Sequence, residues 1–187
     1  MVLVLCIGDL HIPHRATDLP PKFKQLLVPG KIHHSLSPGN LCTKEIHDYL
    51  KTVCADMHVT KGDFDEDGNY PEDKVLKVGE FKIGMVHGHQ IVPAGGKERL
   101  AFLARQMDVD ILVTGHTHEF KADCIEGRLL INPGSATGAF NSLHEEVVPS
   151  FVLMDITGKK ATLYVYEMKG SEMAVTKIEH PDPSLET

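Results

Sequence analysis

Polar residues with metal-binding side chains recur at regular intervals, close behind short apolar segments. His11, Asn40, Asp63, His87 and His116 stand 29, 23, 24 and 29 residues apart, about one strand–helix–strand return each. In an α/β sheet this spacing brings successive loops to the same carboxyl edge, where ligand sites form. We therefore expect seven side chains to converge on one pocket: Asp9, His11, Asn40, Asp63, His87, His116 and His118.

The chemistry of these side chains favours divalent metal ions. Imidazole suits zinc and iron, and carboxylates suit manganese and magnesium. Seven ligands exceed the needs of one tetrahedral ion and fit two ions about 3.5–4 Å apart. Any one motif is weak, because a single histidine after a strand is more often a hydrogen-bonded loop residue. Five such elements in chain order are much harder to obtain by chance, so the sequence predicts a two-metal pocket.

The hydrophobic pattern predicts a single α/β domain over residues 1–180. Amphipathic stripes favour two helices, one around residues 44–53 and one around 100–107. The early segments are typical of βαβ units and the later ones of antiparallel hairpins. Residues 181–187 contain two prolines and are expected to form a flexible C-terminal tail. Strands are expected at residues 2–7, 32–36, 57–60, 75–78, 81–86, 111–114, 122–125, 128–131, 150–155, 161–168 and 173–179.

Composition narrows the class of protein. A chain of 187 residues with 42% hydrophobic residues can bury one real core. Its formal net charge of -7 disfavours bare nucleic acid as a partner. No apolar run approaches the roughly 20 residues that span a bilayer, so no direct membrane insertion is expected. The cysteines form no C-x-x-C pair, which favours reduced thiols in a cytosolic protein. They are Cys6, Cys42, Cys54 and Cys124.

Five segments resemble the motifs of the metallophosphoesterase family. They are residues 8–11 (GDLH), 39–42 (GNLC), 62–65 (GDFD), 87–89 (HGH) and 115–118 (GHTH). Residues 8–14, 27–31 and 132–139 are more similar still to the branch that supplies the small vacuolar protein sorting subunit of retromer, an endosomal sorting complex. The resemblance covers nearly the whole chain. It implies a four-layer α/β/β/α sandwich of two packed mixed sheets with outer helices.

The resemblance also implies a role for each candidate ligand. Asp9, His11 and His118 would hold one metal. Asp63, His87 and His116 would hold the second, with Asn40 between the two ions.

Three positions depart from the family pattern. Asn40 stands where aspartate usually bridges the metals, and an amide is a weaker ligand. Asp63 stands where asparagine is usual, so the pocket keeps two carboxylates. The negative charge of Asp63 would lie on one metal instead of between both. Phe64 replaces a histidine that protonates the leaving group in many family enzymes, and losing such an acid typically costs about 10²–10⁴-fold in rate. We therefore expect weak binding of zinc or manganese, with sites that can stay unfilled.

Two apolar surfaces are predicted to bind protein partners. Ile91 and Val92 should lie near the mouth of the pocket, where a phosphoesterase normally presents cations and hydrogen-bond donors. A second patch, away from the pocket, is expected to comprise Leu3, Leu27, Leu153, Tyr164 and Val175. The alternative for both surfaces is that these side chains are buried beneath loops or helices and bind no partner. Seven histidines fit no constellation and are expected on the surface or in packing roles: His14, His33, His34, His47, His58, His144 and His180.

Three functions follow from these observations and the resemblance. The first is a non-catalytic or weakly catalytic scaffold that docks on the large helical-solenoid subunit of retromer. In that role it would bind regulators of endosomal traffic and serve endosome-to-Golgi and recycling transport. It would be cytoplasmic and peripheral on endosomes. The second is a metal-dependent phosphodiesterase or phosphatase, and the third is a purely structural metal site.

Overall fold

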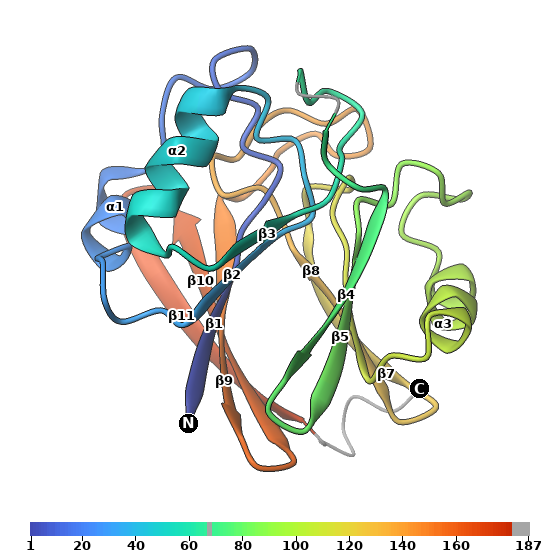
Figure 1. The fold of residues 1–187 in the computed structure, drawn as a ribbon. Helices are drawn as coiled ribbons and strands as arrows, with labels where there is room; N and C mark the ends of the chain where they lie inside the picture. The colour runs from blue at the N-terminus through green and yellow to red at the C-terminus, as the bar shows by residue number, and fades with distance from the viewer. Residues whose placement is uncertain (67–68, 181–187) are drawn as a thin grey trace.

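Eleven strands and three helices make up the described part of the computed structural model, residues 1–66 and 69–180 (Figure 1). The predicted tail at 181–187 lies outside the described residues. The helices are α1 (Pro21–Leu26), α2 (Lys44–Val53) and α3 (Lys97–Gln106). The strands are β1 (Val2–Cys6), β2 (His34–Ser37), β3 (Met57–Val59), β4 (Asp73–Val78), β5 (Phe81–Val86), β6 (Ile111–Val113), β7 (Phe120–Ile125), β8 (Arg128–Pro133), β9 (Ser150–Thr157), β10 (Lys160–Lys169) and β11 (Glu172–His180).

The strands form two mixed sheets. The first has the order β11-β10-β9-β1-β2-β3, in which β1, β2 and β3 run parallel and the other pairs run antiparallel. The second has the order β4-β5-β6-β8-β7. Here β8 pairs in parallel with β6, although β8 also forms a hairpin with β7. The expectation of an all-antiparallel second half was therefore wrong at β8, because the hairpin is inserted into the sheet through its second strand.

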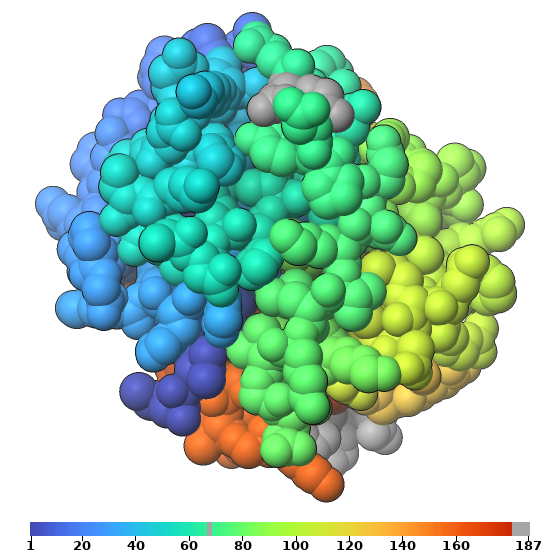
Figure 2. Space-filling view, in the orientation of Figure 1, coloured from blue at the N-terminus to red at the C-terminus, as the bar shows by residue number. Residues whose placement is uncertain are grey.

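The two sheets pack face to face around the main core. Val4 and Val152 of the first sheet meet Met85, Val113 and Ile131 of the second, and all five side chains are buried. Figure 1 shows α1 and α2 outside the first sheet and α3 outside the second. Figure 2 shows the same face filled in, with the cyan surface of α2 and the yellow-green surface of α3 on opposite sides. The predicted four-layer α/β/β/α sandwich is confirmed.

The helices are held by one apolar face each. Leu50 and Val53 of α2 pack against the outer face of the first sheet, and Leu100 and Ala104 of α3 pack against the second. The short helix α1 was not predicted, because it has six residues and only Phe23 among them is buried. None of the described helices is long and apolar enough to cross a membrane.

Candidate metal centre

All seven predicted ligands lie together at the carboxyl ends of the central strands. We call this group, Asp9, His11, Asn40, Asp63, His87, His116 and His118, the candidate metal centre. Five of the seven have backbone φ angles in the left-handed region, where residues other than glycine are uncommon. These are Asp9 (φ 50), His11 (φ 47), Asn40 (φ 56), His116 (φ 72) and His118 (φ 62). Such strain clusters at functional sites, where the surrounding structure imposes it.

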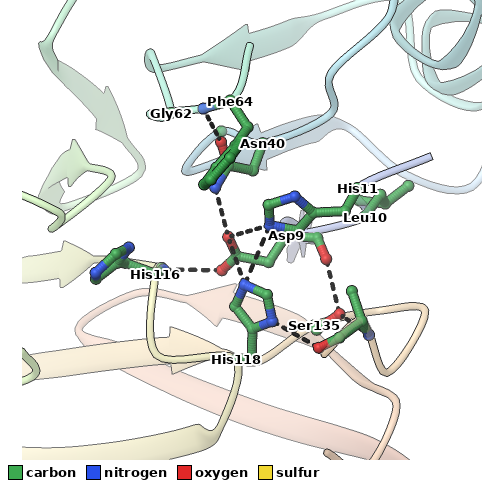
Figure 3. A network of polar contacts seen from close by, with 12 residues as sticks. Asp9, Leu10, His11, Asn40, Gly62, Phe64, His116, His118 and Ser135 are labelled. Carbon is green, nitrogen blue, oxygen red and sulfur yellow. Dashed lines mark hydrogen bonds and ion pairs between the residues drawn. The ribbon is translucent and has the colours of Figure 1, made fainter. Parts of the chain in front are cut away.

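One triad of ligands is almost fully buried. Single ligand atoms of Asp9, His11 and His118 lie within 4.8 Å of one another. The Nε2 atoms of the two histidines are 3.1 Å apart, and the Asp9 carboxylate lies 3.5 Å from His118 Nε2 (Figure 3). A buried carboxylate with two imidazole nitrogens is a donor set that suits a transition metal. These three residues therefore fit the first metal position that the family resemblance implies.

The second triad is more open to solvent. Asp63, His87 and His116 also place one ligand atom each within 4.8 Å of one another. His87 is fully buried and its Nε2 lies 3.1 Å from the Asp63 carboxylate, whereas Asp63 and His116 are partly exposed at the pocket wall. The two triads are joined by Asp9, whose second carboxylate oxygen accepts the backbone N–H of His116 at 2.8 Å. The donor sets therefore fit two neighbouring divalent ions.

Asn40 lies between the triads and presents its nitrogen to them. Its amide NH₂ is 2.9 Å from the Asp63 carboxylate, 3.0 Å from His87 Nε2 and 3.4 Å from Asp9. Its oxygen is turned away and accepts the backbone N–H of Phe64 at 2.9 Å (Figure 3). In this conformation the bridging position supplies hydrogen-bond donors to the carboxylates and no lone pair for a metal.

Carbonyl oxygens behind the histidines fix their orientation. His118 Nδ1 donates to the carbonyl of Ala139 at 2.7 Å, and His87 Nδ1 donates to the carbonyl of Pro38 at 2.8 Å. With its proton on Nδ1, His118 can present the lone pair of Nε2 to the pocket, whereas His87 Nε2 faces the Asp63 carboxylate at 3.1 Å. Metal-binding histidines are normally oriented by such a bond. These partners could not be predicted from the sequence, because the main chain supplies them.

Asp65 organises the loops, and sequence reasoning missed it. Its carboxylate accepts the backbone N–H groups of Asn40 (2.9 Å), Cys42 (2.8 Å) and Gly62 (2.8 Å). It thereby ties the loop after β2 to the loop after β3. The available signal was the second acid of the GDFD segment, two residues beyond the ligand Asp63.

The surroundings set the charge of the ligands. Burial, with a smaller effect from His118, lowers the pKa of His11 to about 3, so this imidazole is neutral and can offer a lone pair. Partial burial would raise the pKa of Asp63, but hydrogen bonds from His87 and Asn40 outweigh it and hold that pKa well below its ordinary value. Burial and the nearby His87 lower the pKa of His116. Burial would lower the pKa of His87, but its hydrogen bond to Asp63 and the charge of Asp9 outweigh burial and raise that pKa. A metal ion at the second triad would therefore displace the proton that His87 shares with Asp63.

The pocket above the centre has a volume of about 390 Å³ and is lined by both polar and apolar side chains. Phe64 is 49% exposed at the position of the missing histidine, and the Arg15 guanidinium lies 4.5 Å above its ring. Arg15 also donates to the carbonyl of Phe140 at 2.9 Å. Phe140 and Leu143 also line the pocket and are exposed. Arg15 is therefore engaged at the rim by an aromatic ring and a carbonyl.

The predicted partner residues Ile91 and Val92 lie beside the pocket, whereas Ala94 of the same segment lines it. They form a separate hollow of about 340 Å³ with Phe102 and Leu103 of α3. Val92 is 76% exposed and Phe102 is 56% exposed.

The second predicted patch lies on the outer face of the first sheet, except for one residue. Tyr164 pairs with Leu153 across β10 and β9, and both are half-buried, as is Leu3. Val175 on β11 is 50% exposed. Leu27 differs from the expectation, because it is 4% exposed and packs in the core beneath α1. Its burial follows from the short helix that the sequence did not reveal.

Comparison with known proteins agrees with the fold. Residues 2–159 match the calcineurin-like phosphoesterase superfamily domain. The vacuolar protein sorting-associated protein 29 of Schizosaccharomyces pombe is 47% identical over 186 residues, which cover 97% of this chain and all of the relative.

Two solved structures are similar over nearly their whole length. Wild-type Vps29 of Entamoeba histolytica in complex with zinc is 46% identical with a TM-score of 0.91, covering 95% of this chain and 99% of that one. Vps29 of Chaetomium thermophilum in complex with a cyclic peptide is 40% identical with a TM-score of 0.85, covering 96% of each chain. The chain therefore belongs to the calcineurin-like phosphoesterase superfamily and, within it, to the Vps29 family of vacuolar protein sorting proteins.

Proposed function

We propose that this protein is a scaffold subunit of retromer that docks on the large helical-solenoid subunit through the face around the candidate metal centre. The observation that carries the proposal is the character of that face. Phe64 occupies the position of a general acid, and exposed Phe140 lines the same pocket. Exposed Val92 and Phe102 form the separate hollow beside it. A dianionic substrate needs cations and donors at such a rim, whereas aromatic and aliphatic side chains suit a protein partner.

The role in traffic follows from this docking. The subunit would act at endosomes as a peripheral, cytoplasmic member of the complex, in endosome-to-Golgi and recycling transport. Membership of the Vps29 family supports vacuolar protein sorting as the process. Turnover of a phosphoester would be absent or weak in this role.

A pull-down with the solenoid subunit tests the docking face. Val92→Asp places a charge in the hollow beside α3 and should reduce the captured protein at least tenfold, about 1.4 kcal/mol of binding free energy. Val75→Asp is a matched control, because Val75 is 48% exposed on β4 and does not line that hollow. Equal capture of the Val92→Asp variant and the wild type would contradict the proposed location of the docking face.

The second apolar patch is proposed to bind regulators of endosomal traffic. Leu3, Leu153, Tyr164 and Val175 lie on the outer face of the first sheet, away from the metal centre, with Leu27 buried beneath. Tyr164→Asp should weaken regulator binding and leave capture by the solenoid subunit unchanged. Loss of both interactions together would show that the two surfaces do not act separately.

Zinc or manganese is proposed as the ion of the candidate metal centre. The two triads are the supporting observation, and the zinc complex of the E. histolytica relative shows that such an ion binds that protein. Saturating metal should stabilise the fold by about 2.7 kcal/mol when its concentration is a hundredfold above its Kd. Denaturation with zinc, manganese or a chelator measures this stabilisation. His118→Gln should abolish the part of it that comes from an ion in the first triad.

A metal-dependent phosphodiesterase is the second candidate, and the nearly complete ligand set favours it. Two ions would lower the pKa of a bound water and polarise phosphoryl oxygens. Asp9 and His118 would hold one ion, while Asp63 would keep the other at the open wall. Hydrolysis of a bis-arylphosphate with manganese present, compared with Asp9→Ala, separates the candidates. Rapid turnover that the variant loses would favour the enzyme over the scaffold.

A further inference from the structure

A second group of metal-binding side chains lies at the opposite end of the first sheet. His34 is the first residue of β2, and Asp56 and His58 stand immediately before and within β3. The candidate metal centre lies beyond the carboxyl ends of these same strands. His34 and His58 fit no constellation in the sequence, because 22 residues and helix α2 separate His34 from Asp56.

The parallel pairing of β2 and β3 builds this group. Leu36 is in register with His58, and the backbone N–H of Ser35 donates to the carbonyl of Asp56 at 2.9 Å. These bonds place Asp56 between the two histidines. His34 Nδ1 lies 2.5 Å from one carboxylate oxygen of Asp56, and His58 Nε2 lies 3.2 Å from the other.

We propose that His34, Asp56 and His58 form a second, surface zinc site. One ligand atom from each residue lies within 4.8 Å of the others, the same criterion that both triads of the metal centre meet. Two imidazoles and one carboxylate are three protein ligands for zinc, with water completing the coordination. The side chains of His34 and His58 are 28% and 18% exposed and that of Asp56 is 52% exposed, so an ion can reach the site from solvent.

The charge of the group suits a cation. Partial burial would raise the pKa of Asp56, but hydrogen bonds from His34 and the charge of His58 lower it below its ordinary value. Asp56 is therefore an ionised carboxylate between two imidazoles. A zinc ion would replace the protons that now lie between Asp56 and the rings.

A missing hydrogen bond at His58 limits the affinity of this site for zinc. Zinc on His58 Nε2 would leave the ring proton on Nδ1, a buried atom without a hydrogen-bond partner among the described residues. Metal-bound histidines normally donate that proton to an acceptor, and losing such a partner costs about 10–100-fold in affinity. The site should therefore bind zinc more weakly than a closed four-ligand structural site.

A zinc titration of the intact protein, followed by NMR of ¹⁵N-labelled histidines, tests the proposal. Zinc should shift the His34 Nδ1 and His58 Nε2 resonances, and equilibrium dialysis should show one zinc equivalent fewer for Asp56→Asn and for His58→Gln. Loss of a direct ligand should weaken this site at least about tenfold. His47→Gln is the matched control, because His47 pairs with Asp48 at 3.2 Å and lies in no three-ligand group of the described residues.

Two results would overturn the proposal. One is that zinc in large excess leaves the His34 and His58 resonances unchanged. The other is that Asp56→Asn and His58→Gln bind as much zinc as the wild type and the His47→Gln control. Either result would make Asp56 only a hydrogen-bond acceptor that joins β2 to β3. A double variant, Asp9→Ala with Asp63→Ala, provides a second measurement, because it should keep the zinc bound at His34 and His58 while weakening the metal centre.

Discussion

The side-chain oxygen of Asn40 accepts the backbone N–H of Phe64 at 2.9 Å, so the amide nitrogen of Asn40 faces the candidate metal centre. An N–H group can only donate, which fixes the amide orientation. Two of the three departures from the family motifs, Asn40 and Phe64, are thus coupled, since the main chain of Phe64 holds the side chain of Asn40. Asn40 could offer oxygen to a metal only by giving up this bond.

Asn40→Asp should make stability strongly dependent on metal. In a chelator, a third carboxylate beside Asp9 and Asp63 would replace the donated hydrogen bonds with repulsion. We expect the free energy of unfolding to fall by about 1–3 kcal/mol. Excess manganese should recover it, because a carboxylate can bridge two cations. Urea denaturation measures both states, and equal stability of variant and wild type in chelator would contradict this account of Asn40.

Asp65→Ala should destabilise the protein without removing any proposed ligand. The variant leaves the N–H groups of Asn40, Cys42 and Gly62 without their acceptor. We expect a loss of about 1.5–3 kcal/mol in the free energy of unfolding. Glu66→Ala is the control, because the Glu66 side chain forms an exposed pair with His14 and such pairs contribute at most about 1 kcal/mol. Similar losses in both variants would show that Asp65 does not organise the loops.

Phe64→His should raise any residual phosphodiesterase activity. The new imidazole would stand where the family places a proton donor, and general acids contribute typically about 10²–10⁴-fold. Hydrolysis of a bis-arylphosphate with manganese measures the change, and Phe64→Leu controls for loss of the Arg15 contact. If neither variant gains activity, the missing general acid is not what limits catalysis. The departures at the ligands Asn40 and Asp63 would then be the main cause of the low activity.

Protonation of His11 should lower the free energy of unfolding of the metal-free protein in acid. Its folded pKa of about 3 lies below the ordinary value of 6.5, so the unfolded chain binds a proton that the native protein excludes. This contribution is fully present above pH 6.5 and is lost as the pH falls towards the folded value. Urea denaturation in chelator at several pH values should show a steeper loss for wild type than for His11→Gln. Parallel curves would contradict the lowered pKa.

Much of the fold could be read from the sequence, because hydrophobic periodicity marks buried faces directly. The amphipathic stripe of α2 and the antiparallel hairpin of β4 and β5 lie where the pattern predicts them. The sequence did not reveal α1, whose six residues are too few for a helical stripe. Leu27 was consequently expected on the surface, although α1 and its neighbours bury it.

The sequence by itself determined which residues could bind metal and in which order their loops would return to one edge of the sheet. Residue types and strand spacing carry that information, since parallel strands place their following loops together. Only the tertiary structure decided how those residues face one another. The nitrogen of Asn40 turned inward, the carbonyls behind His87 and His118, and the meeting of His34 with His58 all depend on contacts between segments distant along the chain.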